Sequence, residues 1–309
     1  MYVRKRIRQR TIEPDNSVRV GSVRTFMEAL ENIELTDDYA LYFRGHSNFS
    51  YELKPYIYRD LNWLKNEDVL FKEIVLKCPN DFREQENTFQ MLVKMQHYSL
   101  PTRLLDLTAN PLIALYFACS EGKSRIEGGE VVVLKIPKRE IRYHDSDTVS
   151  VISNISRRPS SFKIPRIRDE YKFNESTEMK YLLHEIKKEK PYFESKIKRE
   201  HLGSVVCVKP KLDNPRIIKQ DGAFLLFGVK TDKNTPADID PEYLYQEQRI
   251  IVKHLDKRKI LEQLRTLGIT KGSIFPEIDR VAEHLRDIYA TADKEELTSK
   301  SSGRKKTRR

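Results

Sequence analysis

Apolar positions along the chain follow two spacings, one typical of strands and one typical of amphipathic helices. Short runs rich in β-branched and aromatic residues predict strands near 40–44, 103–107, 130–136, 204–208, 215–227 and 247–253. Apolar residues at helical spacing predict a first helix opened by Ser22, and further helices within 66–98, 176–189 and 256–289. Strands and helices do not alternate regularly. The pattern therefore predicts an α+β single domain with a split, largely antiparallel sheet flanked by helices.

One segment combines many hydrogen-bonding side chains with an entirely apolar helix. The segment, residues 96–111, precedes the apolar run 112–119, and its polar residues include His97, Tyr98, Thr102, Arg103, Asp106, Thr108 and Asn110. Asn110 followed by Pro111 is typical of a helix N-cap and first helical position. A helix without a polar face must be surrounded by protein, and its N-terminus attracts anions. The alternative is that Arg103 only pairs with Asp106, while Thr108 and Asn110 only cap the helix.

A second polar cluster ends the predicted strand 40–44. Arg44 is suited to phosphate or carboxylate, and Gly45 lets a backbone come close to a ligand. The plainer interpretation is a surface arginine before a turn. Although 58 residues separate Arg44 from Thr102, we expect one cleft to collect both clusters: Arg44, Thr102, Arg103, Thr108 and Asn110.

The net charge of +11 comes from the two ends of the chain. Residues 1–10 carry five basic residues and residues 300–309 carry six, with no acidic residue in either stretch, so residues 11–299 are balanced. Basic ends can bind RNA or DNA by neutralising phosphates, or they can simply keep a protein in solution.

Composition also predicts the domain layout and the compartment. We expect a basic arm over 1–20, one domain over 21–290 with a polar insertion or mobile lid at about 140–200, and a basic disordered tail over 291–309. No apolar run approaches the roughly 20 residues that span a bilayer, and no apolar leader begins the chain. Three scattered cysteines suit a reducing compartment. These features predict a cytoplasmic protein without membrane association.

The motifs resemble the FRG domain family of mostly bacterial proteins. The resemblance rests on Phe43-Arg44-Gly45-His46, on the block from Gln96 to Ala118, and on the later blocks at Pro215-Arg216, 220–224 and 275–279. It extends from about residue 25 to 285, so the domain is expected to be FRG-like. Leu107 stands where tryptophan is usual, and Ser99 where glycine is usual. The family resemblance does not imply an established activity.

The order of the parts is also similar to that of ADP-ribosyltransferases. This second resemblance implies NAD as a substrate, held by the first-strand arginine, Arg44, with Gly45, and by the segment with Thr108 and Asn110. Thr102 and Arg103 belong to the same candidate cofactor-binding set. His97 and Tyr98 join this set as a ligand-binding pair, with tyrosine stacking on a base; alternatively, His97 only caps the preceding helix.

The resemblance also implies a late catalytic glutamate that binds the nicotinamide ribose. Gln220 matches its position but carries no charge, and Glu247 on the next predicted strand could supply the carboxylate. Which of the two residues serves stays open.

Three functions follow as hypotheses. The first is an NAD-dependent ADP-ribosyltransferase, either a toxin or an antiviral effector, acting on nucleic acid or protein and controlled by an antitoxin or regulatory protein. The second is a nucleotide- or nucleic-acid-binding module without transfer chemistry. The third is a nuclease-like effector that uses Glu52, Asp106 and Glu247 around a divalent ion. The sequence has no glycine-rich phosphate loop and no paired His/Cys metal spacing.

Overall fold

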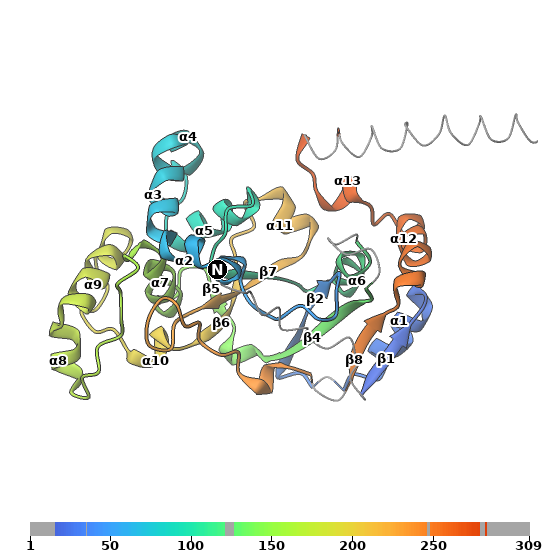
Figure 1. The fold of residues 1–309 in the computed structure, drawn as a ribbon, viewed down its shortest axis with the longest axis horizontal. Helices are drawn as coiled ribbons and strands as arrows, with labels where there is room; N and C mark the ends of the chain where they lie inside the picture. Colours follow the sequence, from blue (N-terminus) through green and yellow to red (C-terminus); the bar gives the residue numbers. More distant parts are fainter. Residues whose placement is uncertain (1–15, 35, 121–126, 246–247, 279–281, 283–309) are drawn as a thin grey trace, which may run out of the picture.

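A single eight-stranded sheet crosses the whole molecule (Figure 1). The computed structural model describes residues 16–34, 36–120, 127–245, 248–278 and 282. The strand order is β1-β8-β4-β2-β3-β7-β6-β5. The strands are β1 Ser17–Val20, β2 Tyr39–His46, β3 Leu104–Thr108, β4 Gly129–Pro137, β5 Arg142–Tyr143, β6 Val205–Lys209, β7 Gly222–Phe227 and β8 Arg249–Val252. Only β1–β8 and β5–β6 pair in parallel among these strands. The α+β, largely antiparallel fold is therefore confirmed.

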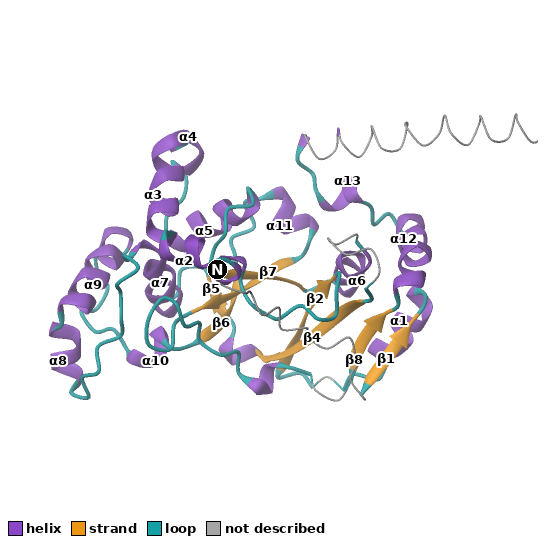
Figure 2. Ribbon diagram, in the orientation of Figure 1, coloured by secondary structure: helices purple, strands orange, loops and turns teal. Residues whose placement is uncertain are grey.

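Helices pack along one face of the sheet and at its two ends (Figure 2). Their bounds agree with most of the predicted helical stretches. The helices are α1 Val23–Glu31, α2 Leu61–Lys65, α3 Glu67–Lys77, α4 Pro79–Phe82, α5 Thr88–His97, α6 Pro111–Cys119, α7 Asp147–Asn154, α8 Glu170–Glu175, α9 Thr177–Glu189, α10 Arg199–Leu202, α11 Pro215–Lys219, α12 Lys257–Thr266 and α13 Lys271–Ile274. Ser22 caps α1, as predicted, by accepting a hydrogen bond from the backbone N–H of Thr25 at 3.2 Å.

The sheet is split between β2 and β3. These neighbours share one register pair, Phe43 with Thr108, whereas β2 pairs with β4 at eight positions and β3 pairs with β7 at five. Where the β2–β3 ladder stops, the Arg44 side chain donates from Nη1 to the backbone carbonyl of Asp106 at 2.6 Å. The Arg44 side chain of β2 thus supplies the hydrogen bond to this carbonyl of β3. The sheet stays continuous here, and we call this junction of one register pair the split.

Two separate cores lie on the helical face of the sheet, one on each side of the split. One core packs α1, α6 and α12 on β2, β4 and β8, and includes Phe43. The other packs α3, α5, α7 and α9 on β3, β6 and β7, and includes Leu104 and Phe224. Figure 1 shows α7 to α10 at one end of the molecule, with α1 and α12 at the other. Alternating residues of the same strands, such as Leu105 and Leu107, form a third core on the opposite face.

Some boundaries differ from the prediction for identifiable reasons. Residues 215–219, predicted as part of a strand, form helix α11, because Asn214 caps Pro215 at the first helical position. Residues 17–20, assigned to the basic arm, form β1 and pair with β8. The polar stretch 140–200 contributes to the core. Its spaced apolar residues on α7 and α9 are buried against α5 and its neighbours. The predicted tail and most of the helix predicted beyond 278 lie outside the described residues.

Candidate functional site

Helix α6 fixes the centre of the site, and its start is set by a local cap. Asn110 Oδ1 accepts a hydrogen bond from the Leu112 N–H at 3.0 Å, and Pro111 occupies the first helical position, as predicted. Gly45 of β2 lies directly against this helix, because a Cβ at Gly45 would lie 2.0 Å from the carbonyl oxygen of Ala114. The glycine therefore brings strand and helix backbones together. Its role in the structure is close packing.

A cleft opens beside α6, where β2 and β3 separate. It has a volume of about 240 Å³ and is lined by Phe43, Arg44, Gly45, Asp106, Leu107, Thr108, Phe117, Arg216 and Gln220. A smaller hollow of about 30 Å³ lies next to it between α5 and α11, and Asp106, Leu107, Arg216 and Gln220 line both spaces. The cleft thus lies between the two helix groups, directly over the split in the sheet.

Arg44 is the most buried cation of this cleft, with 17% of its side chain exposed. Besides its bond to the Asp106 carbonyl, its Nε donates to His46 Nε2 at 3.1 Å. The Asp106 carboxylate lies 3.7 Å from Arg44 Nη1, too far for a good hydrogen bond. Burial lowers the pKa of Arg44 and the charge of Asp106 opposes that effect. The guanidinium stays charged, because arginine does not lose its proton in proteins.

Arg216 of α11 supplies a second guanidinium to the cleft. Its Nη1 donates to the backbone carbonyl of His97 at 3.3 Å, and its guanidinium lies over the Phe275 ring, 4.7 Å from the centroid. The Glu277 carboxylate lies 3.9 Å from Arg216 Nη1 and 2.8 Å from His97 Nε2. Phe275 in turn contacts Phe117 edge to face, with ring centroids 6.0 Å apart. The cleft therefore presents two guanidinium groups beside aromatic rings.

Thr108 and Gln220 reach the cleft together, since one bonds to the other. The Thr108 hydroxyl donates to the backbone carbonyl of Gln220 at 2.5 Å and accepts from the Asn110 N–H at 3.0 Å. The Gln220 side chain donates from Nε2 to the carbonyl of Ile274 at 3.2 Å. Its amide oxygen remains as an acceptor that can face a ligand. Arg44, Thr108 and Gln220, although far apart in sequence, line one cleft.

Thr102 and Arg103 do not line the cleft. Arg103 is fully buried and forms a two-pronged pair with Glu67 of α3, at 2.9 Å from Nε and 2.5 Å from Nη2. Its Nη1 donates to the Phe227 carbonyl at 3.1 Å. The expected Arg103–Asp106 pair is therefore absent among the described contacts, because Arg103 is directed into the core between α3 and β7. Thr102 is also buried and donates to the side chain of Gln96.

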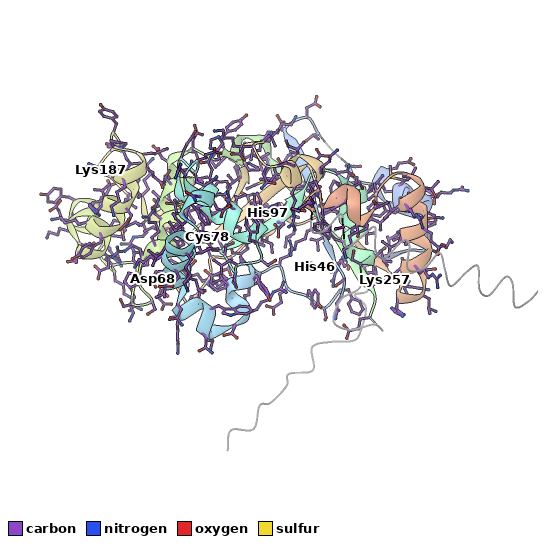
Figure 3. All side chains as sticks on the ribbon, turned by 90° about the horizontal axis from the view of Figure 1, so that it is seen from above. His46, Asp68, Cys78, His97, Lys187 and Lys257 are labelled. Atoms are coloured by element: carbon purple, nitrogen blue, oxygen red, sulfur yellow. The ribbon has the colours of Figure 1, made fainter. Side chains whose placement is uncertain are left out.

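His97 and Tyr98 end α5 at the rim of the site. His97 lines the smaller hollow and makes the contacts with Arg216 and Glu277 described above, so it links α5 to the segment after α13. Tyr98 is 62% exposed and packs edge to face on the His97 ring. Figure 3 labels His97 and His46, which lie at separate places in the fold. Asn110 does not line the cleft, and its side chain caps α6.

The sequence prediction did not assign Arg216 and Phe117, which line the cleft, or Glu277 and Phe275, which contact them, to the candidate site. The blocks that carry the family resemblance contain all four residues, but nothing in their spacing indicated a shared cleft. Glu247, one of the two catalytic candidates, lies outside the described residues. Within the described part of the chain, no group of three or more His, Cys, Asp or Glu side chains is arranged to hold a metal ion. Every helix in that part is too short or too polar to cross a bilayer.

The fold and the cleft define an α+β protein with a polar cleft at a split antiparallel sheet. The family model of the FRG domain matches residues 39–126, which run from β2 through α6 and include Arg44, Asp106 and Thr108. This part of the chain is an FRG domain, and the first resemblance is confirmed there. Comparison with the curated proteins and with the solved structures finds no match.

Proposed function

We propose that the cleft between β2, β3, α6 and α11 binds a phosphorylated nucleotide, with NAD as the first ligand to test. The observation that carries the proposal is a contrast among the arginines. Arg103 and Arg249 each hold a carboxylate through two short contacts. Arg44 and Arg216, in the cleft, have their nearest carboxylates at 3.7 and 3.9 Å. Their planar forks therefore keep donors for paired phosphate oxygens.

The other walls of the cleft suit the rest of a nucleotide. Phe117 lines the cleft and offers a ring on which a flat base can pack, and Phe275 supports this ring edge to face. Gln220 also lines the cleft, and its side-chain amide can hydrogen-bond a ribose hydroxyl. A volume of about 240 Å³ is below the roughly 300–1,000 Å³ of typical ligand pockets, so the cleft fits one half of a dinucleotide. The other half would lie outside the cleft, because the adjoining hollow of about 30 Å³ has room for little more than a water molecule.

Binding of NAD to the purified protein tests this function directly. We expect Arg44→Lys and Arg216→Lys each to weaken NAD binding about tenfold, because an ammonium cannot reproduce a two-pronged contact. Arg258→Lys is the matched control, since Arg258 is 93% exposed on α12 and lies outside the cleft lining. Isothermal titration calorimetry gives the affinities, and circular dichroism checks the fold of each variant. Equal affinity in the parent and both cleft variants would end the proposal.

ADP-ribosyl transfer is the second candidate, favoured by the meeting of Arg44, Thr108 and Gln220 in one cleft, as the second resemblance implies. The chemistry needs a carboxylate to stabilise the oxocarbenium-like state. Asp106 lines the cleft, and Glu247 remains the candidate proposed from sequence. With labelled NAD and a mixture of RNA, DNA and protein acceptors, Asp106→Asn and Glu247→Gln should lower turnover by roughly 100- to 1000-fold for whichever carboxylate acts.

Nicotinamide release separates these two candidates. A binding module takes up NAD without releasing nicotinamide, whereas a transferase releases one nicotinamide for each ADP-ribose transferred. Gln220→Ala is expected to weaken ribose positioning with a smaller effect on turnover than loss of the acting carboxylate. An effect of Gln220→Ala as large as that of the carboxylate variants would contradict the assigned roles.

A further inference from the structure

A second cavity lies on the face of the sheet opposite α6. Its volume is about 440 Å³, and strands β2, β4 and β8 form its floor. His46 and Val132 point into it, because Gly45, between Arg44 and His46, faces α6 and side chains alternate along a strand. Leu53 and Leu244 add apolar walls, and neither residue lines the first cleft. The cavity falls within the usual range of small-molecule sites.

His46, which lines this cavity, has a buried donor without a protein partner among the described residues. His46 is 3% exposed, and its Nε2 accepts the hydrogen bond from Arg44 Nε. An imidazole that accepts at Nε2 carries its hydrogen on Nδ1. Nδ1 has no hydrogen-bond partner among the described residues. An unsatisfied buried donor costs about 1–3 kcal/mol, so the site favours a ligand that brings an acceptor.

The positive charges around His46 keep its imidazole neutral, and not all of them are balanced by a carboxylate. Burial, followed by the charges of Arg44, Arg59 and Arg249, lowers the pKa of His46 to about 3. Arg249 is balanced by its two-pronged pair with Glu130. Arg59 makes no ion pair among the described residues, and its guanidinium lies over the rings of Tyr51 and Tyr56, at 5.8 and 5.3 Å. An anionic group near Arg59 would therefore be attracted.

An aromatic wall completes the second cavity. Tyr51 lines it and meets the His46 ring edge to face, with centroids 6.1 Å apart. A flat ring can pack between Tyr51 and the apolar floor at Val132, while a ring nitrogen or carbonyl oxygen accepts from His46. A nucleotide combines a hydrogen-bond acceptor, a flat ring and a negative charge in one molecule.

We propose that the second cavity binds a nucleoside monophosphate, with the base at His46 and Tyr51 and the phosphate towards Arg59. This site shares no lining residue with the first cleft, and it does not depend on the function proposed for that cleft. The hydrogen bond between His46 and Arg44 links the two described cavities through side chains, and the pairing of β2 with β4 links them through the backbone.

The experiment titrates the full chain with AMP, adenosine and inorganic phosphate by calorimetry. Val132→Phe fills the cavity floor and is expected to weaken AMP binding more than tenfold while leaving NAD binding unchanged. Leu53→Trp does the same from a loop, so the test survives if the strand variant fails to fold. Arg59→Gln is expected to weaken AMP about tenfold and adenosine hardly at all. Lys54→Gln is its matched control, because Lys54 is a nearby exposed cation paired with Glu52.

Two results would overturn the proposal. One is the absence of AMP binding by the parent protein. The other is that Arg216→Gln, in the first cleft, loses AMP binding while Val132→Phe and Leu53→Trp retain it. That result would place AMP in the first cleft. If the parent protein binds AMP and both cavity-filling variants do not, the second site is supported, whether or not the protein binds NAD.

Discussion

Replacing Arg103 by methionine tests whether this arginine supports the fold or binds a ligand. Arg103, Glu67 and Lys233 form a buried ionic cluster, with exposed side-chain fractions of 0%, 3% and 1%. Lys233 Nζ lies 2.9 Å from Glu67 Oε2. Methionine fills much of the arginine volume but removes both contacts to Glu67 and the bond to the Phe227 carbonyl. Removing one partner of a buried pair costs about 3–5 kcal/mol, because the remaining charge is poorly compensated.

Thermal and urea unfolding followed by circular dichroism measure this loss. For a protein of 309 residues, whose entropy of unfolding is about 0.65 kcal/mol/K, we expect the midpoint temperature of Arg103→Met to fall by roughly 5–8 °C. Arg139→Met is the control, with an expected change below about 0.5 kcal/mol, since Arg139 is 84% exposed. The structural role of Arg103 would be refuted if Arg103→Met were as stable as the parent but no longer bound nucleotide. Arg103 would then be a binding residue.

The same cluster predicts an acid dependence of stability. Burial alone would raise the pKa of Glu67, but Arg103 and Lys233 together outweigh it and lower the pKa from 4.5 to about 2. Because the folded pKa lies below the unfolded one, the stabilisation is present above about pH 4.5 and is lost as the pH falls towards 2. It amounts to about 3 kcal/mol at neutral pH. Urea unfolding at pH 7 and pH 3 should show a smaller acid loss in Arg103→Met than in the parent.

Three further substitutions test local features by urea unfolding at pH 7. Asn110→Ala is expected to cost about 1 kcal/mol, because the Leu112 N–H loses its cap; no change would show that the cap does not stabilise α6. Ser99→Gly should be neutral or stabilising by up to about 1 kcal/mol, since Ser99 has a left-handed φ of 64°; a clear loss would contradict this. Gly45→Ala should cost about 3 kcal/mol or more, because its Cβ would overlap the Ala114 carbonyl; wild-type stability would exclude the close packing.

Features set by neighbouring residues could be predicted from the sequence. The Asn110-Pro111 signal gave the start of α6 correctly, because a cap and its helix are adjacent in the chain. Asn214-Pro215 carries the same signal and starts α11, yet the β-branched residues after it favoured a strand. At that position the N-cap signal predicts the observed helix, whereas the β-branched residues do not. Ser99, noted where glycine is usual, indeed has the backbone conformation that glycine favours.

The parts of the site that depend on distant residues could not be predicted in this way. Arg44 and Arg103 look equally suited to an anion in the sequence. Glu67, which lies 36 positions before Arg103, directs that arginine into the core. Arg216 and Glu277 meet His97 only because α11 and the segment after α13 fold back onto α5. Residue type gives the possible chemistry, whereas burial and long-range partners select which residues face the cleft.

The split in the sheet has a consequence for where this protein can be divided. The FRG match, residues 39–126, contains β2 and β3 but neither of the strands with which they mainly pair, β4 and β7. Excised at those boundaries, the segment would keep one β2–β3 register pair and expose two long strand edges to other chains. The family match thus spans the junction between two half-sheets. Any truncation or fusion has to retain both halves to keep the cleft.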